Sequence, residues 1–250
     1  MKLQTVFPTM TDQPEKKAIA NGITYWIVAF LALPFVMILF TADIYNRHDW
    51  VIWFEIGYHA INFVATLVFF CGYLKESFFN VQLCFKSFIF TALICLVLVV
   101  FLKIAVFIAA AVTGMEFWAS AALGSLLTSE MDLLYFSCVL PHFSPVYGTI
   151  CLVFLAPVTT SCLYYACCFA PVCGTRRWGA YPVVALALLI PRLALALSVW
   201  TLSEELIIYA LQLPVHLLLC WAYQKTDTIW APITVIALSN LLIGLLFLFI

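Results

Sequence analysis

The sequence has 250 residues, of which 66% are hydrophobic and only 9% are charged. Soluble globular domains carry about 25% charged residues, so this composition excludes an ordinary water-soluble domain. The formal net charge of −1 gives no basic excess, which argues against nucleic acid as a partner. The lipid bilayer is therefore the expected environment and partner of the chain.

The apolar runs are continuous, which predicts an all-α fold. A bilayer core about 30 Å thick is crossed by roughly 20 apolar residues in a helix. A membrane β-barrel would show segments of about 10 residues with alternating polarity, a pattern that this sequence lacks. We therefore expect a polytopic transmembrane helical bundle.

Residues 1–23 are expected to form a cytoplasmic N-terminal tail. Transmembrane helices then occupy the N-terminal part, residues 24–147, and a four-helix core occupies residues 148–250. The expected spans cover residues 24–42, 50–74, 86–114, 148–170, 180–200, 204–223 and 228–250.

The stretch 116–140 is harder to assign, because Glu130 and Asp132 lie within otherwise apolar sequence and Pro141 and Pro145 follow. We interpret it as peripheral or re-entrant, which gives seven spans; if it crosses, there are eight.

The basic residues favour seven spans with the N-terminus inside, because cytoplasmic loops collect Lys and Arg. In that arrangement only Arg47 lies outside. The cytoplasmic side carries eight basic residues: Lys2, Lys16, Lys17, Lys75, Lys86, Arg176, Arg177 and Lys225.

The ten cysteines lie mostly in or at the ends of apolar runs, which favours packing over metal binding. Cys167, Cys168 and Cys173 cluster at one helix end, where a metal or lipidation role is the less favoured alternative.

Ionisable residues within a span are candidates for function, because placing them in lipid costs a few kcal/mol. A structural role competes with a functional one at each position: Lys103 could extend to the interface, Glu55 and His59 could bond each other, and His216 could make an interhelical contact. The intramembrane polar candidates are Glu55, His59, Lys103, Arg192, His216 and Asn240.

From residue 156 onward the chain resembles the CPBP family, the CAAX-protease and bacteriocin-processing group of intramembrane metalloproteases. The resemblance rests on APV at 156–158, RRWGAYP at 176–182, WAYQKT at 221–226, and IWAPI at 229–233 followed by ALSN at 237–240. In that family the Trp-Ala-Pro-Ile segment introduces a helix with a His-x-x-x-Asn motif. Asn240 stands at the Asn position. The resemblance predicts that a family model would match the chain.

The family's catalytic residues are replaced in this sequence. Thr159 and Thr160 stand where the resemblance implies paired glutamates, and Tyr164 stands at the arginine position. No histidine occurs between positions 189 and 195, where Arg192 lies, and Ile236 replaces the histidine before Asn240. Hydroxyl and alkyl groups do not act as general bases or tight Zn²⁺ ligands near neutral pH, so no catalytic residue and no cofactor are predicted.

We therefore expect a degenerate CPBP-like protein of a prokaryotic plasma membrane that binds a membrane protein or hydrophobic peptide, in regulation or in peptide immunity. The predicted cavity-lining residues are Thr159, Thr160, Tyr164, Arg192 and Asn240.

Two alternatives remain open. An active metalloendopeptidase with unusual ligands would bind zinc and depend on His59 or His216. A small transporter or channel would line its path with Glu55, His59, Lys103 and Arg192.

Overall fold

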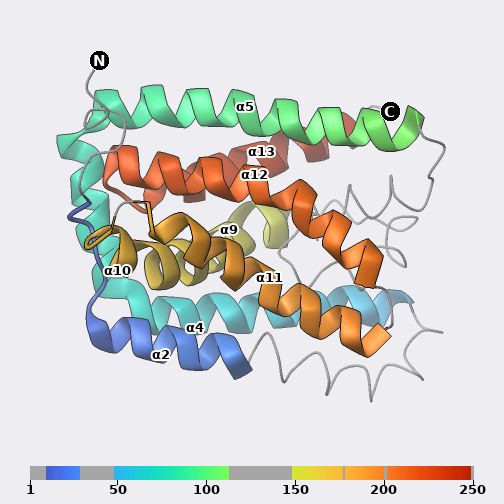
Figure 1. Ribbon diagram of the computed structural model, residues 1–250, viewed down its shortest axis with the longest axis horizontal. Coiled ribbons are helices and arrows are strands. Elements are labelled where there is room, and N and C mark those ends of the chain that lie inside the picture. Colours follow the sequence, from blue (N-terminus) through green and yellow to red (C-terminus); the bar gives the residue numbers. More distant parts are fainter. Residues whose placement is uncertain (1–9, 29–47, 113–147, 177, 200–201, 249–250) are drawn as a thin grey trace.

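The computed structural model describes residues 10–28, 48–112, 148–176, 178–199 and 202–248, and every regular element in these ranges is helical. The helices lie roughly alongside one another in a bundle (Figure 1). In chain order the elements are α2 (Lys16–Ile27), α4 (His48–Leu83), α5 (Phe85–Val112), η4 (Gly148–Leu155), α9 (Ala156–Thr160), η5 (Ser161–Phe169), α10 (Ala170–Cys173), α11 (Ala180–Val199), α12 (Leu202–Thr226) and α13 (Trp230–Leu248).

Three stretches of helix are apolar and long enough to cross a membrane: His59–Leu83, Phe85–Ala105 and Val153–Cys173. The shortest of them have 21 residues, which at 1.5 Å per residue extend about 31 Å, the thickness of a hydrocarbon core. Ala180–Ile190 and Trp230–Ile243 are apolar but shorter within the described residues. The expectation of membrane-spanning helices is confirmed at this level.

Residues 148–173 form one helical segment at the centre of the bundle, which we call the central segment. It alternates between π-helical turns (η4 and η5) and α-helical turns (α9 and α10). Pro157 and Pro171 each lie in the first turn of an α-helical stretch. Because proline has no N–H to donate, local rearrangement of the backbone hydrogen bonds accommodates it inside a membrane helix.

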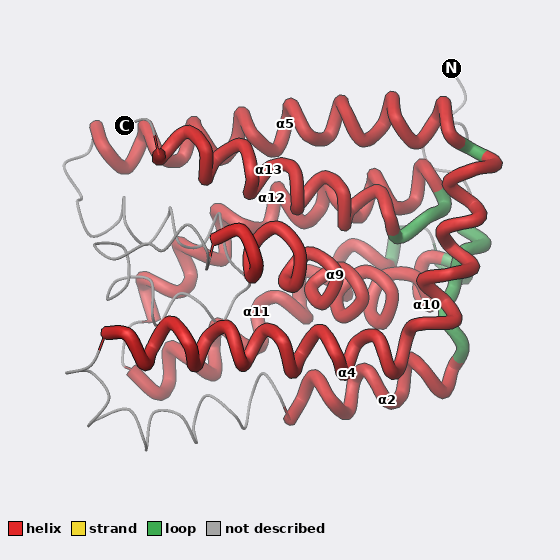
Figure 2. Tube along the Cα trace, turned by 180° about the vertical axis from the view of Figure 1, so that it is seen from behind, coloured by secondary structure: helices red, strands yellow, loops and turns green. Residues whose placement is uncertain are grey.

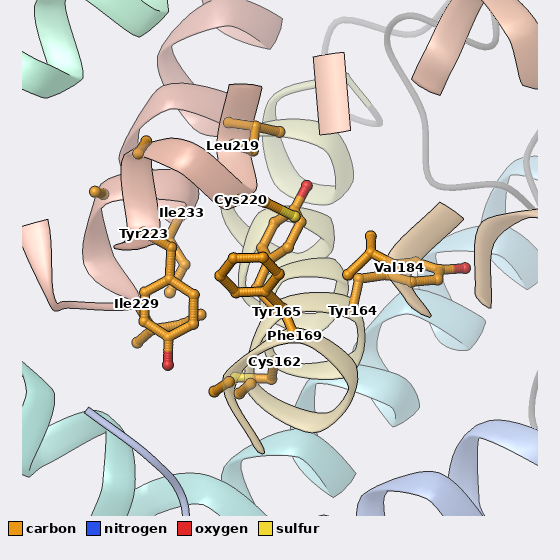
Figure 3. Packing of buried hydrophobic residues seen from close by; sticks show 14 of the residues in the cluster. Cys162, Tyr164, Tyr165, Phe169, Val184, Leu219, Cys220, Tyr223, Ile229 and Ile233 are labelled. Atoms are coloured by element: carbon orange, nitrogen blue, oxygen red, sulfur yellow. The ribbon is translucent and has the colours of Figure 1, made fainter. Parts of the chain in front are cut away.

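The central segment contacts α2, α4, α11 and α13, which places it in the interior. Of the residues in its apolar stretch, 72% are buried, compared with 28% in α5. Aromatic side chains fill this core: Tyr165 and Phe169 project from the central segment, and Phe169 contacts Tyr223 of α12 (Figure 3). The core is therefore built around the central segment.

α4 and α5 lie at the outside of the bundle, with α5 packed against α12 and α13. Both views show α5 running alongside α13 (Figures 1 and 2). Exposed apolar residues follow the outer face of α5, as expected for a surface in contact with lipid: Phe90, Leu93, Val97 and Phe101.

One end of the bundle collects the first residue of α2, α5 and α13 and the last of α4 and α12; we call it the basic end (Figure 1). The described basic residues at this end are Lys16, Lys17, Lys75, Lys86, Arg176 and Lys225. The sequence predicted that these six share one side of the membrane, and the fold gathers them at one end.

The helix bounds differ from the expected spans near the N-terminus. α2 begins at Lys16, within the stretch expected to be a tail, and residues 10–14 pack onto the bundle with Met10 and Asp12 buried. Most of the expected span 24–42 and the whole of 116–140 lie outside the described residues.

Candidate functional site

The first polar centre lies between α5 and α13. The Lys103 ammonium donates a hydrogen bond of 2.8 Å to Asn240 Oδ1 and one of 3.0 Å to Ser239 Oγ. Lys103 is only 4% exposed, so its side chain does not extend to the interface. Ser239 in turn donates to the Ile236 carbonyl at 3.0 Å. We call Lys103, Ser239 and Asn240 the Lys103 centre.

The predicted residues Thr159 and Thr160 are both buried, on the α-helical stretch α9. α9 packs against α4 and α13, so they face the interior of the bundle. Thr159 Oγ1 donates to the Leu155 carbonyl at 3.2 Å, a bond within its own helix. The Ser161 hydroxyl is fully buried and makes no hydrogen bond to any of the described residues.

Tyr164 and His216 meet in the core. Their rings make an edge-to-face contact with centroids 5.8 Å apart. The neighbouring Tyr165 hydroxyl lies 2.7 Å from His216 Nδ1, in hydrogen-bond contact. Residues from the central segment and α12 thus form an aromatic and imidazole cluster, which agrees with the interhelical contact expected of His216.

Three predicted residues make no described contact with these groups. His59 is buried on α4. Glu55 lies on α4 and Arg192 lies on α11, but their side chains are outside the described residues. The structure therefore joins Lys103 with Asn240 and Tyr164 with His216, and it describes no contact among the other candidates.

A second polar centre, which the sequence did not predict, lies at the basic end around Asp12. The Asp12 carboxylate accepts hydrogen bonds from Tyr73 at 2.9 Å and from Ser77 at 2.8 Å. The backbone N–H of Ile229 donates to the same carboxylate oxygen at 3.3 Å. The Tyr223 hydroxyl donates to the Asp12 carbonyl at 3.0 Å and is hydrogen-bonded to Tyr73.

The neighbouring turn completes this network. Asp227 accepts the backbone N–H groups of Thr11 at 2.8 Å and Asp12 at 2.9 Å. Ser77 and Thr228 share a hydrogen bond of 2.9 Å between their hydroxyls. We call Asp12, Tyr73, Ser77, Tyr223, Asp227, Thr228 and Ile229 the Asp12 centre.

Burial changes the protonation of this centre. Desolvation raises the pKa of Asp12 from 3.8 to about 6, assisted by the nearby Asp227 charge. The hydrogen bonds from Ser77 and Tyr73 stabilise the ionised form and oppose that rise. The spacing of Tyr73 and Ser77, four apart and so on one face of α4, is the only sequence signal that could have indicated this centre.

The donor set at the resemblance positions does not suit zinc. Zn²⁺ takes thiolate, imidazole or carboxylate ligands, whereas these positions offer two threonine hydroxyls and an amide that accepts from an ammonium. Among the described residues, no group of three His, Cys, Asp or Glu side chains is placed to hold a metal ion.

No family model, curated protein or solved structure matches this chain. The expectation that a family model would match is therefore wrong. The CPBP resemblance remains one of short sequence stretches.

Proposed function

We propose that this chain is a polytopic membrane protein with a CPBP-like core, which binds a membrane protein or a hydrophobic peptide and does not hydrolyse peptide bonds. The role would be regulatory or protective, as in immunity to a secreted peptide. The observation that carries this proposal is the contact between Asn240 and Lys103, 2.8 Å long.

In the family that the sequence resembles, the residue at this position accompanies an imidazole in the catalytic site. Here its amide oxygen accepts from a fixed ammonium of the same chain, and Ile236 replaces the imidazole. This contact occupies the amide oxygen that the resemblance places in the catalytic site, and it holds α5 against α13. The contact therefore supports a site in which the catalytic residues have been replaced and which now serves helix packing and ligand binding.

The described positions on α9 support the same proposal. Thr159 and Thr160 are small, buried and uncharged, and α9 packs between α4 and α13. Small residues allow close approach of another helix in lipid, where association depends on packing and on hydrogen bonds more than on a hydrophobic driving force. A hydrophobic peptide is the class of ligand that this environment suits.

Binding without cleavage is the test. Purified full-length protein in detergent is mixed with a fluorescent apolar helical peptide, and binding is followed by anisotropy while peptide mass is followed by mass spectrometry. We expect saturable binding of an intact peptide. Thr160→Phe, which enlarges a buried side chain, should weaken binding, whereas Leu186→Phe on the exposed face of α11 should not.

Zinc content separates this proposal from the metalloendopeptidase alternative. About one zinc ion per chain, together with a cleaved peptide, would contradict it. Uptake into liposomes that depends on Glu55 would favour the transporter alternative instead.

The proposal includes seven spans in a prokaryotic plasma membrane, with the basic end in the cytoplasm. The six basic residues at one end support this orientation. Alkaline phosphatase fused to the C-terminus should then be active, since an odd number of spans places that terminus outside. A fluorescent GFP fusion at the same position would indicate eight spans.

A further inference from the structure

Residues 10–14, which we call the N-terminal segment, lie against the basic end in the manner of a bound peptide. Met10, Asp12 and Pro14 are buried, whereas the intervening Thr11 and Gln13 are exposed. Such alternation is typical of an extended chain, whose successive side chains point to opposite sides. Pro14 favours this conformation, because the residue before a proline is restricted to extended backbone. Every second side chain of the segment is thereby buried in the protein.

The backbone of the N-terminal segment is held as well. The Asp227 carboxylate accepts the consecutive N–H groups of Thr11 at 2.8 Å and Asp12 at 2.9 Å. The Tyr223 hydroxyl donates to the Asp12 carbonyl at 3.0 Å. Domains that bind extended peptides use the same two kinds of contact: main-chain hydrogen bonds give affinity, and pockets for alternate side chains give specificity.

The side chain of Asp12 is recognised by three donors. The hydroxyls of Tyr73 and Ser77 and the backbone N–H of Ile229 all donate to the same carboxylate oxygen. These groups favour an occupant with an acceptor at this position, because a buried donor without a partner is unfavourable. Asp227 favours N–H groups and repels a second free anion, so the site suits a peptide better than a phosphate or a lipid headgroup.

A water-soluble partner can reach this end of the bundle. Lys75 and Glu76 are exposed on α4 beside Tyr73 and Ser77, and Asp227 is only partly buried. The basic residues gathered at this end attract an acidic segment. The N-terminal segment belongs to no helix, and such segments open at a lower free energy than packed helices do.

We propose that the Asp12 centre is a peptide-recognition site, which the N-terminal segment occupies in cis and from which an extended segment of a partner protein displaces it. The partner segment carries an apolar side chain, an aspartate and a proline at alternate positions, as residues 10–14 do. The partner is a different protein and not a second copy, because only Glu15 separates the N-terminal segment from α2, which packs on its own bundle. This site is separate from α9, so it does not rest on the proposed function.

The first experiment uses the wild-type protein and does not depend on whether a variant folds. A capped peptide with the sequence of residues 10–15, which contains no trypsin site, is added in millimolar excess to full-length protein in detergent. Trypsin cleavage after Lys16 and Lys17 should become at least about fivefold faster, because cleavage follows the population of the open state. A control peptide with alanine in place of the aspartate should not accelerate cleavage.

The second experiment measures binding by anisotropy of the labelled peptide. Full-length Asp12→Ala should bind it at least about tenfold more tightly than the wild type does, because the N-terminal segment then competes less well for the site. Adding Asp227→Gly removes the carboxylate that holds the peptide backbone and should abolish this gain. Adding Glu76→Ala instead, at an exposed position on α4, should leave the gain unchanged.

Equal effects of the aspartate and alanine peptides on trypsin cleavage of the wild type would overturn the proposal. Equal binding of the two peptides to Asp12→Ala would overturn it as well. A wild-type dimer that the peptide dissociates would overturn the assignment of the partner to a different protein. Because none of these measurements involves α9, they leave the proposed function untouched.

Discussion

The Asp12 carboxylate accepts a hydrogen bond of 2.9 Å from the Tyr73 hydroxyl, which lies 61 positions later in the chain. This contact joins the segment before α2 to the last third of α4. The same aspartate reaches the α12–α13 turn through Ile229. A residue of the N-terminal segment is thereby the meeting point of three elements, and its protonation state affects all of them.

The stability of the protein should depend on the protonation of Asp12. Burial raises the pKa of this carboxyl from 3.8 to about 6, so the folded state binds a proton more tightly than the unfolded state does. Stability should therefore rise as the pH falls from about 7 to about 4, by up to about 3 kcal/mol, since each unit of pKa difference is worth about 1.4 kcal/mol. Thermal unfolding in detergent across this pH range measures it.

Asp12→Asn is the control for that prediction, because it keeps the shape of the side chain and removes the titration. The variant should lose most of the pH dependence between about 4 and 7. An unchanged pH profile would show that another group titrates in its place.

Asp227 should hold the N-terminal segment through its side chain. Its backbone has φ of 52°, a left-handed conformation that glycine adopts without strain, so Asp227→Gly removes the carboxylate and spares the turn. Each lost hydrogen bond to a charged group costs about 1.5–3 kcal/mol, so trypsin should cleave after the exposed Lys16 and Lys17 at least about tenfold faster. Asp227→Asn keeps an acceptor oxygen and should be cleaved more slowly than Asp227→Gly.

Two glycines should respond oppositely to alanine. A Cβ at Gly22 would lie 2.8 Å from both Cys167 Sγ and Phe70 Cζ, so Gly22→Ala should lower the stability by about 1–3 kcal/mol. At Gly72 no atom lies within 4 Å of the added Cβ, and Gly72→Ala should raise the stability by up to about 1 kcal/mol through helix propensity. The buried cysteines allow unfolding to be followed with a thiol-reactive dye.

Trp230 should contribute more to stability than Trp178. The Trp230 indole N–H donates to the Leu74 carbonyl at 3.0 Å, which ties the start of α13 to α4. Trp230→Phe removes this bond and should cost about 1 kcal/mol, whereas Trp178→Phe at a 58% exposed position should stay within about 0.5 kcal/mol. Equal losses of melting temperature in the two variants would contradict this assignment.

The helical architecture could be predicted because each helix is indicated by residues within its own stretch of sequence. Continuous apolar runs define helices without knowledge of their neighbours, and α5 (Phe85–Val112) lies within two residues of the expected 86–114. α2 was less predictable, since it begins with two lysines, Lys16 and Lys17, which resemble part of a solvated tail. Its place in the bundle comes from contact with the central segment, which no local pattern reveals.

The polar centres were predictable only in part. Lys103 and Asn240 stood out as polar residues in apolar sequence, but they are 137 positions apart and no sequence pattern pairs them. Asp12 did not stand out, because a charged residue among polar neighbours is normally solvated. Its burial depends on partners in α4 and in the α12–α13 turn, and only the tertiary structure brings these together.

The Asp12 centre also sets an order of events during synthesis. Thr11 and Asp12 are synthesised before their partners Asp227 and Ile229, which lie 215 to 217 positions later. These bonds form only after the α12–α13 turn has been made. The segment before α2 therefore docks late, once the turn that holds it has reached its place beside α4.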